Sequence, residues 1–277
     1  MNEINFYKYQ ALGNDYIVID PNKQEVSLTK DFVVKMCDRN FGVGSDGILY
    51  GPISRGDEIL LKIINPDGSE AEKSGNGIRI FSKYLFDHGY VTNDYTLITK
   101  GGKVEVCYLD NKAELIKVDM GTVTFSSNRI PVRGNSRDVI QENLIIEDEK
   151  FAITCLSIGN PHCVVLVDAL SKDMAAHYGP LIENNDIFPE RINVQFMKIL
   201  DRNNIQIEIW ERGAGYTLAS GSSSCAAASV AYKLGYVGEN INVHVPGGII
   251  SINIDDNQHV HMTGAVGYVF CGSYGGY

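Results

Sequence analysis

The sequence predicts an α+β protein of two pseudo-symmetric halves, each a mostly antiparallel sheet around one central helix, with a cleft between the halves. Three observations predict this fold class. Glycine-containing signals recur at a constant offset of 146 residues, stretches of alternating apolar residues indicate strands, and each half holds one long helical stretch that begins at Ser-Gly. A chain of 277 residues is also long enough for two domains.

The repeat is visible in three places that share one register. Residues 74–91 read SGNGIRIFSKYLFDHGYV, and residues 220–237 read SGSSSCAAASVAYKLGYV. The Gly-Asn pair at 13–14 returns at 159–160, and the Gly-Gly pair at 101–102 returns at 247–248. Because no gap separates these matches, we expect two copies of one fold, each of about 146 residues or less.

Each half can be interpreted in chain order. A strand ends at Gly-Asn and resumes in an apolar stretch, at residues 16–20 or 163–168. A helix is expected near 29–39 or 171–183, and a strand at 58–65 or 204–210. The Ser-Gly turn and the long helix follow, with Gly89 and Gly235 as natural helix ends. Strands that begin near Tyr95 and Asn240 lead to the Gly-Gly turns, and residues 259–270 predict one last strand.

Composition excludes several classes of protein. The formal net charge of −10 and a pI near 5.1 argue against a nucleic-acid partner and against docking on an anionic membrane. No apolar run approaches the roughly 20 residues of a membrane span, and the N-terminal residues lack a signal-peptide pattern. We therefore expect a cytoplasmic protein without a membrane partner.

The sequence predicts neither a metal site nor a bound cofactor. None of the six cysteines forms a C-x-x-C pair, so zinc and thioredoxin-like motifs are not indicated, and we expect buried reduced thiols. No lysine has a recognisable pyridoxal-phosphate context. The glycine-rich stretches GGKVEV and GGIISI read as hairpin turns, because no G-K-[ST] follows them.

The paired helix starts suggest a binding site for an anion. A helix N-terminus offers unpaired N–H groups and a partial positive charge, and Gly75-Asn76-Gly77 and Gly221-Ser222-Ser223 open the two long helices. One carboxylate held between them would present its α-carbon to Ser74 and Ser220, which suits proton removal on one face and delivery on the other. The alternative is that both serines are plain N-caps.

Six segments, in order, resemble the diaminopimelate epimerase family over nearly the whole chain. They are YQALGNDYIVID, RNFGVGSDGIL, INPDGSEAEKSGNGIRIF, SIGNPHCVV, ERINVQF and ERGAGYTLASGSSSCAAA. The resemblance implies a pair of similar domains around a cleft, residues 1–118 with 266–277 and residues 119–265, often as a homodimer. It also implies an isomerase of lysine biosynthesis that inverts an α-carbon without pyridoxal phosphate, through a cysteine thiolate and a cysteine thiol.

The resemblance also implies roles for individual residues. Positions that contact the distal amino-acid end of the substrate would be Asn14, Asn65, Asn160, Asn193 and Arg212. Glu211 would lie near the α-carboxylate end, with the helix-start amides of Gly75, Asn76, Gly221 and Ser222. His162 and Glu211 would assist the two proton carriers. An arginine and a carboxylate form a planar, bidentate pair, which suits the role of Arg212.

The chain departs from the family at the two proton carriers. The family has cysteine where this chain has Ser74 and Ser220. Either both cysteines were replaced to trap a substrate, or the chain is a natural serine variant. Lys73, Ile80, Tyr216 and the serine run 222–224 are also unusual for the family, which favours the second explanation. Serine needs an activating base, because an alkoxide forms far less readily than a thiolate.

Three functions remain open from the sequence. The first is an epimerase or racemase that acts on diaminopimelate, converting the LL to the meso form, or on a similar polar amino acid. The second is a related isomerase or dehydratase of the same fold. The third is a homologue that binds an amino acid without catalysis.

Overall fold

The computed structural model describes residues 3–56 and 58–275, which form two compact units. Unit 1 comprises Met1–Asp119 with Thr263–Tyr277, and unit 2 comprises Met120–Met262. The division falls one residue after the first expected domain boundary and three residues before the second. That the two units are separate folding domains stays a prediction.

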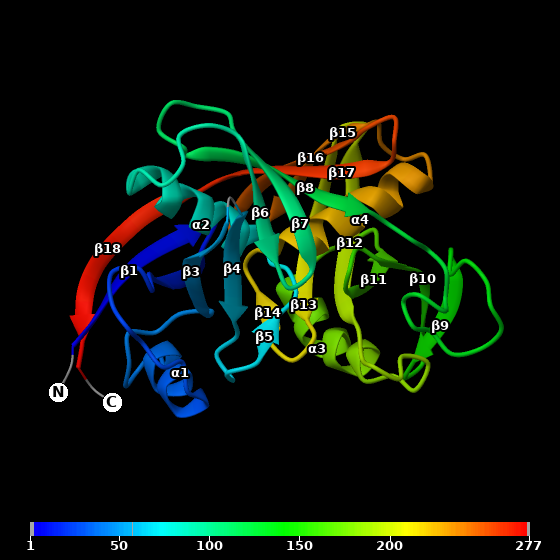
Figure 1. The fold of residues 1–277 in the computed structure, drawn as a ribbon. Helices are drawn as coiled ribbons and strands as arrows, with labels where there is room; N and C mark the ends of the chain where they lie inside the picture. Colours follow the sequence, from blue (N-terminus) through cyan, green and yellow to red (C-terminus); the bar gives the residue numbers. More distant parts are fainter. Residues whose placement is uncertain (1–2, 57, 276–277) are drawn as a thin grey trace. The chain divides into compact units, whose positions relative to one another are not determined.

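Unit 1 is mostly sheet, with two helices among its described residues (Figure 1). Its elements in chain order are β1 (Ile4–Ala11), β2 (Asn14–Ile19), α1 (Lys30–Cys37), β3 (Ile48–Arg55), β4 (Glu58–Ile64), β5 (Glu70–Ala71), α2 (Gly75–Asp87), β6 (Tyr95–Thr99), β7 (Gly102–Tyr108), the start of β8 (Leu115–Thr122) and β18 (Gly267–Tyr274). Strand β1 pairs with β2 and with β18, both antiparallel, so the C-terminal strand completes the sheet of this unit.

Unit 2 repeats the same order of elements. Its elements are β9 (Glu142–Ile146), β10 (Glu149–Ser157), β11 (Pro161–Leu166), α3 (Lys172–Glu183), β12 (Asn193–Asp201), β13 (Asn204–Glu211), β14 (Gly215–Thr217), α4 (Gly221–Lys233), β15 (Asn240–Val245), β16 (Gly248–Ile254) and most of β17 (His259–Ala265). The helices α2 and α4 both have 13 residues and begin at Gly75 and Gly221, the offset seen in the sequence.

Strand pairing confirms the pseudo-symmetry. In unit 1, β2 and β3 are parallel, β3 and β4 antiparallel, and β4 and β6 parallel. In unit 2, the corresponding strands β11 and β12 are parallel, β12 and β13 antiparallel, and β13 and β15 parallel. The remaining described pairs within each unit are antiparallel, so the predicted α+β class of mostly antiparallel sheets around a helix is confirmed.

The two long helices are the central helices of their units. Residues 75–85 of α2 are buried, and the helix packs against β1, β2, β3 and β18. The alanines of α4 are fully buried, and this helix packs against β10 to β13, β15 and β16. The apolar residues of α2 and the run of alanines in α4 account for the burial of these helices, although α2 also buries the polar side chains of Arg79, Ser82 and Lys83. Burial fixes the position of each helix start, where the candidate site residues lie.

Two expectations from the sequence need correction. Residues 259–270 form two strands, β17 and β18, because the chain leaves strand geometry at Val266, whose N–H donates to Glu114 O at 2.9 Å. The expectation of buried thiols holds for four of the six cysteines and is wrong for Cys271, which is exposed, and for Cys107, which is half-buried. All six are free thiols.

Candidate active site

The long helices begin in the same way. Ser74 and Ser220 are their N-caps, with φ/ψ of −139°/114° and −142°/124°. The Oγ atom of Ser74 accepts from the backbone N–H of Gly77 at 3.1 Å, and Ser220 Oγ accepts from Ser223 N–H at 3.4 Å. Both serines are therefore helix N-caps. Because a capping serine uses only its oxygen as an acceptor, each hydroxyl can still exchange a proton with a second group, in the positive field of the helix start.

Ser220 has a carboxylate as its second partner. Its Oγ donates to Glu211 Oε2 at 3.2 Å, and the serine is only 5% exposed. Glu211 ends strand β13 and pairs with Gly215 in the hairpin to β14, so the strand end holds the carboxylate at the helix start. A hydroxyl that donates to a carboxylate has a proton acceptor in place.

Ser74 has a phenol as its second partner, which the sequence analysis missed. The Tyr16 hydroxyl lies 3.3 Å from Ser74 Oγ, and Tyr16 is a buried residue of β2. The repeat could have identified it, because the offset of 146 places Tyr16 at the position of His162. In unit 1, the hydroxyl of this phenol therefore lies within hydrogen-bond distance of the candidate proton carrier.

A directed chain of hydrogen bonds orients Asn14 and Asn76 in unit 1. The Nη2 of buried Arg79 donates to Asn76 Oδ1 at 2.8 Å, which turns the Asn76 Nδ2 toward Asn14 Oδ1 at 3.1 Å. Asn14 Nδ2 then donates to Asp46 Oδ2 at 2.7 Å. Because a guanidinium can only donate and a carboxylate only accept, both amide orientations are fixed.

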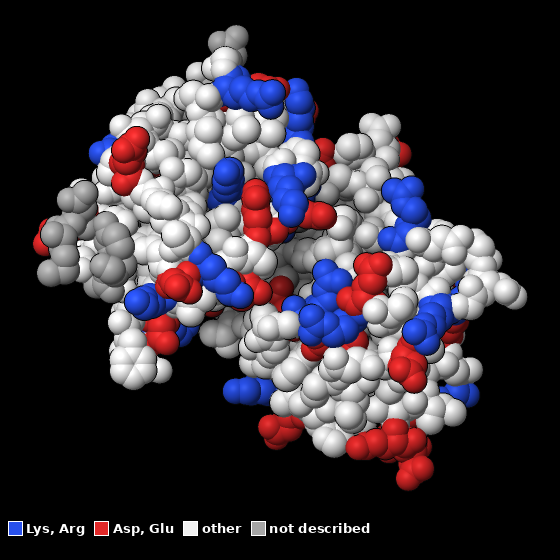
Figure 2. Space-filling model, turned by 60° about the horizontal axis from the view of Figure 1, so that its bottom comes forward, with Lys and Arg blue, Asp and Glu red and all other residues white. Residues whose placement is uncertain are grey.

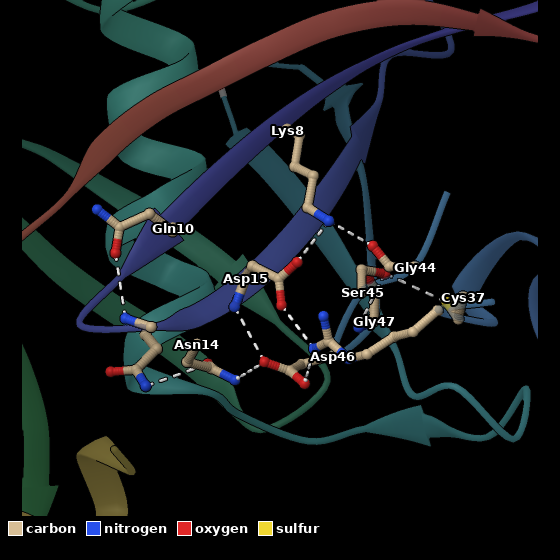
Figure 3. A network of polar contacts seen from close by, with 12 residues as sticks. Lys8, Gln10, Asn14, Asp15, Cys37, Gly44, Ser45, Asp46 and Gly47 are labelled. Atoms are coloured by element: carbon tan, nitrogen blue, oxygen red, sulfur yellow. Dashed lines mark hydrogen bonds and ion pairs between the residues drawn. The ribbon is translucent and has the colours of Figure 1, made fainter. Parts of the chain in front are cut away.

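The far end of this chain is anchored by two cations and two carboxylates. Lys8 Nζ lies 2.6 Å from Asp15 Oδ2, and Arg39 Nη2 lies 2.7 Å from Asp15 Oδ1 and 2.6 Å from Asp46 Oδ1. Burial acts to raise the pKa of Asp15, but the hydrogen bonds from Arg39 and Lys8 hold it below its usual value. Because Arg39 contacts both Asp15 and Asp46, the loop that carries Asp46 is a firm support for Asn14 (Figure 3).

Unit 2 has a similar arrangement around Asn160, the counterpart of Asn14. Asn160 Nδ2 donates to Ser222 Oγ at 3.4 Å, and His162 Nε2 lies 3.0 Å from Asn160 Oδ1. His162 is fully buried, and burial, with the charge of Arg212 adding to it and Gln195 opposing it, lowers the pKa of His162 to about 3. The imidazole is therefore neutral at pH 7 and a weak base in this environment.

Asn193 and Arg212 lie next to each other in unit 2. The backbone N–H of Arg212 donates to Asn193 Oδ1 at 3.0 Å, and Asn193 Nδ2 donates to Pro161 O at 2.8 Å. Asn193 is also the strand partner of His162. The Arg212 side chain donates through Nη1 to Glu190 O at 2.9 Å and is half-buried. This bond holds the guanidinium near the polar end of β12.

Asn65 is placed in a turn. Its N–H donates to Ser69 O at 2.8 Å and its Nδ2 to Ser69 Oγ at 3.0 Å, in the turn between β4 and β5. No hydrogen bond of the described residues joins it to the other candidate residues of unit 1, which are Asn14, Ser74, Gly75 and Asn76. The structure therefore brings together Ser74, Asn76 and Asn14 in unit 1. In unit 2 it brings together Ser220, Glu211, Arg212, Asn193, His162, Asn160 and Ser222, with Gly221 as the first residue of α4.

The comparisons with known proteins decide the family. The family model described as diaminopimelate epimerase matches residues 6–126 and 154–269. A relative named diaminopimelate epimerase 2, from Nostoc sp. strain PCC 7120, is 53% identical over 263 residues, covering 94% of this chain and 92% of the relative. A diaminopimelate epimerase of Pelotomaculum thermopropionicum is 39% identical, covering 98% and 99%. The chain belongs to the diaminopimelate epimerase family.

The fold of this epimerase-family chain is shared with other isomerases. The crystal structure of a probable proline racemase from Agrobacterium radiobacter K84 superposes with a TM-score of 0.73 at 15% identity, covering 99% of this chain and 93% of the other. At that identity the likeness shows the fold alone. Membership of the family makes this chain an isomerase of the epimerase type.

The surface of this epimerase-family member carries charges of both signs. On the face drawn in Figure 2, Lys and Arg side chains are interspersed with Asp and Glu. Among residues 3–56 and 58–275, no group of three or more His, Cys, Asp and Glu side chains could hold a metal ion. None of the described helices is long and apolar enough to cross a membrane. That the reaction needs no cofactor stays a prediction.

Proposed function

We propose that this chain inverts the α-carbon of diaminopimelate, from the LL to the meso form, or of a similarly long and polar amino acid, without a cofactor. This reaction would place it in lysine biosynthesis. The observation that carries the proposal is the matched pair of helix starts, each with a buried or half-buried serine that is hydrogen-bonded to one further proton-exchanging group. We further propose that the protein works in the cytoplasm and as a homodimer.

The helix starts would bind the α-carboxylate. In each unit, the first residues of the long helix present backbone N–H groups in a positive field, which is the usual way proteins hold a small anion without a cation. These are Gly75 and Asn76 in unit 1 and Gly221 and Ser222 in unit 2. We propose that one carboxylate engages both starts, which would expose its α-carbon to Ser74 and to Ser220.

The distal end of the substrate would lie at Arg212 and the asparagines. Arg212 supplies the charge for a second carboxylate, while Asn193 holds the backbone from which it projects. Asn14 and Asn160 are fixed by their hydrogen-bond chains and suit a polar amino-acid head group. Asn65 is proposed with them as a contact from the turn between β4 and β5. A substrate with a second amino-acid group at its distal end would supply binding partners for Arg212 and for these asparagines.

The proton carriers would be the two serines. As the α-proton leaves for Ser220 Oγ, the hydroxyl proton of Ser220 would pass to Glu211, and Ser74 would return a proton on the opposite face. A neutral, weakly basic His162 suits orientation of Asn160 better than proton abstraction. Chemistry through two hydroxyls predicts slower turnover than through two thiols, because the thiolate forms near neutral pH.

The test is solvent-deuterium exchange at the α-carbon. Diaminopimelate incubated with the protein in D₂O should gain one deuterium at the inverted centre, as followed by NMR and chiral chromatography. Exchange or elimination without inversion would support the related isomerase or dehydratase instead. Binding by calorimetry with neither exchange nor inversion would identify a silent amino-acid-binding homologue and contradict the proposal.

A further inference from the structure

The second hydrogen-bond partners of the two serines differ, because one can accept a proton and the other can donate one. Ser220 donates to a carboxylate, which accepts protons. Ser74 lies 3.3 Å from a phenol, which can donate. An ordinary carboxylic acid loses its proton roughly five to six pH units below a phenol, so near neutral pH a carboxyl group serves as a proton acceptor and a phenol as a proton donor.

We propose that Tyr16 is the proton-supplying partner of Ser74, and that unit 2 is the proton-removing and unit 1 the proton-delivering side of the resting protein. The inference rests on the proposed α-carbon inversion and deepens it. A phenol is a much stronger acid than an aliphatic hydroxyl, so a Ser74 hydroxyl backed by Tyr16 delivers a proton far more readily than a serine alone.

The proton transfers balance. On one face, the α-C–H bond breaks, its proton bonds to Ser220 Oγ, and the former hydroxyl proton of Ser220 bonds to Glu211. On the other face, the α-carbanion takes the hydroxyl proton of Ser74, and Ser74 Oγ takes the proton of Tyr16. The protein ends with a protonated Glu211 and a tyrosinate, with unchanged total charge. That form is the one that acts on the opposite epimer, and solvent exchange returns it to the resting form.

The backbone holds the Tyr16 ring in place. Tyr16 is 7% exposed, and it pairs with Tyr9 across the antiparallel strands β1 and β2. Gly47 lies against the ring, and a Cβ atom there would come within 2.8 Å of Tyr16 Cε1 and 2.5 Å of Ile64 O. Only glycine therefore lets the ring occupy this position, which directs the hydroxyl at the helix start.

Three other tyrosines of unit 1 have hydroxyls in structural roles, each donating to a carboxylate. Tyr9 donates to Asp87 at 3.0 Å, and Tyr84 and Tyr90 both donate to Asp20 at 2.6 Å. Burial, with these carboxylates adding to it, raises the pKa of each of the three phenols, so each keeps its proton. The Tyr16 hydroxyl lies 3.3 Å from the hydroxyl of Ser74, with which it can share a proton in either direction.

Tyr95 provides a matched control. Its hydroxyl lies 2.9 Å from Ser82 Oγ, so it is a second tyrosine–serine pair on the same helix. Ser82 lies inside α2, where its Oγ donates to Ile78 O at 2.7 Å, well past the helix start. Replacing either tyrosine by phenylalanine removes the same atom from the same kind of pair.

The experiment separates proton removal from proton delivery. A β-fluoro diaminopimelate releases fluoride once its α-proton has left, as the electron pair forms the Cα–Cβ double bond, and it needs no proton returned. Fluoride release would be measured for both α-epimers of this probe. Inversion of LL- and meso-diaminopimelate would be measured in parallel, with wild type, Tyr16→Phe, Tyr95→Phe and Glu211→Gln, and with binding by calorimetry.

Tyr16→Phe should lose about 10²-fold or more of the inversion rate in both directions, the usual contribution of one acid–base group. It should keep fluoride release from one epimer and lose it from the other. Glu211→Gln should show the opposite epimer preference. Tyr95→Phe should behave as wild type, and all variants should bind diaminopimelate.

Wild-type inversion rates in Tyr16→Phe, or equal loss of fluoride release from both epimers, would overturn the role of Tyr16 and leave the proposed function standing. The same epimer preference in Tyr16→Phe and Glu211→Gln would overturn the assignment of the two sides. A wild-type protein that neither inverts diaminopimelate nor releases fluoride would overturn the proposed function and the inference together.

Discussion

At the scale of single residues, the chemistry of this chain depends on what stands next to each serine. A cysteine at a helix start is acidified by the helix and reacts as a thiolate, whereas a serine there is still a hydroxyl. The structure gives Ser220 a carboxylate and Ser74 a phenol. Glu211 was predicted from the family resemblance. Tyr16 was not, because a strand tyrosine forms no motif by itself, although the offset of 146 residues places it at the position of His162.

Arg212 provides the first prediction. Replacing it with alanine should weaken the binding of diaminopimelate by well over tenfold, because losing one partner of a buried charged contact typically costs about 2–5 kcal/mol. Calorimetry measures this directly. Arg202→Ala is the matched control, since Arg202 Nη1 also donates to a backbone carbonyl, Gly235 O, at 2.8 Å but lies on the surface. Equal affinity in Arg212→Ala and wild type would remove Arg212 from the site.

At the scale of elements, each long helix start combines a structural and a chemical role. Ser171 shows the structural role alone, because it caps α3 by accepting from Met174 N–H at 3.1 Å. Ser220 caps α4 in the same way and also donates to Glu211. The helix cap and the proton carrier are therefore separable by comparing two serines of the same unit.

The second prediction follows from this comparison. Ser171→Ala and Ser220→Ala should each lower the free energy of unfolding by about 1 kcal/mol, the usual cost of losing a serine N-cap. Only Ser220→Ala should abolish inversion. Chemical denaturation and an inversion assay would measure both quantities. If Ser171→Ala and Ser220→Ala lost activity only in proportion to their loss of stability, the role of Ser220 would be limited to capping the helix.

The elements show what the sequence could and could not predict. The long helices and their start residues were predicted, because Ser-Gly, a helical stretch and a glycine end are local signals repeated in both halves. The strands β5 and β14 were not, because two and three residues are too few to show an alternating pattern, and β9 was not, although all three pair with the adjacent strand in the chain. The side-chain network from Arg79 to Asp46 was likewise invisible, because it joins three separate segments of the chain.

At the scale of the whole molecule, the buried neutral His162 links the site to stability. Burial lowers the pKa of His162 to about 3, against about 6.5 in an unfolded chain. Between these values the unfolded state binds the proton and the folded state does not. The stabilisation from neutral His162 is therefore complete above about pH 6.5 and is lost as the pH falls, by up to about 1.4 kcal/mol per pH unit.

The third prediction tests this link. The melting temperature of wild type should fall between pH 7 and pH 4, and His162→Gln should reduce that fall. His177→Gln is the control, because His177 is exposed and paired with Glu147 at 3.1 Å. Calorimetric melts at several pH values would measure the difference. An unchanged pH dependence in His162→Gln would mean that the imidazole is not held neutral by burial.

The pseudo-symmetry of the molecule supports the central claim, which is that two helix-start serines invert one α-carbon. The most direct measurement is the inversion of LL-diaminopimelate in D₂O by the wild type and by the Ser74→Cys/Ser220→Cys double variant. The account predicts slow wild-type inversion with one deuterium at the inverted centre, and a rate about 10²-fold or more higher in the double variant, since each proton carrier contributes that much. Brisk turnover of another amino acid by the serine form with an inactive cysteine form, or no exchange in either form, would contradict it.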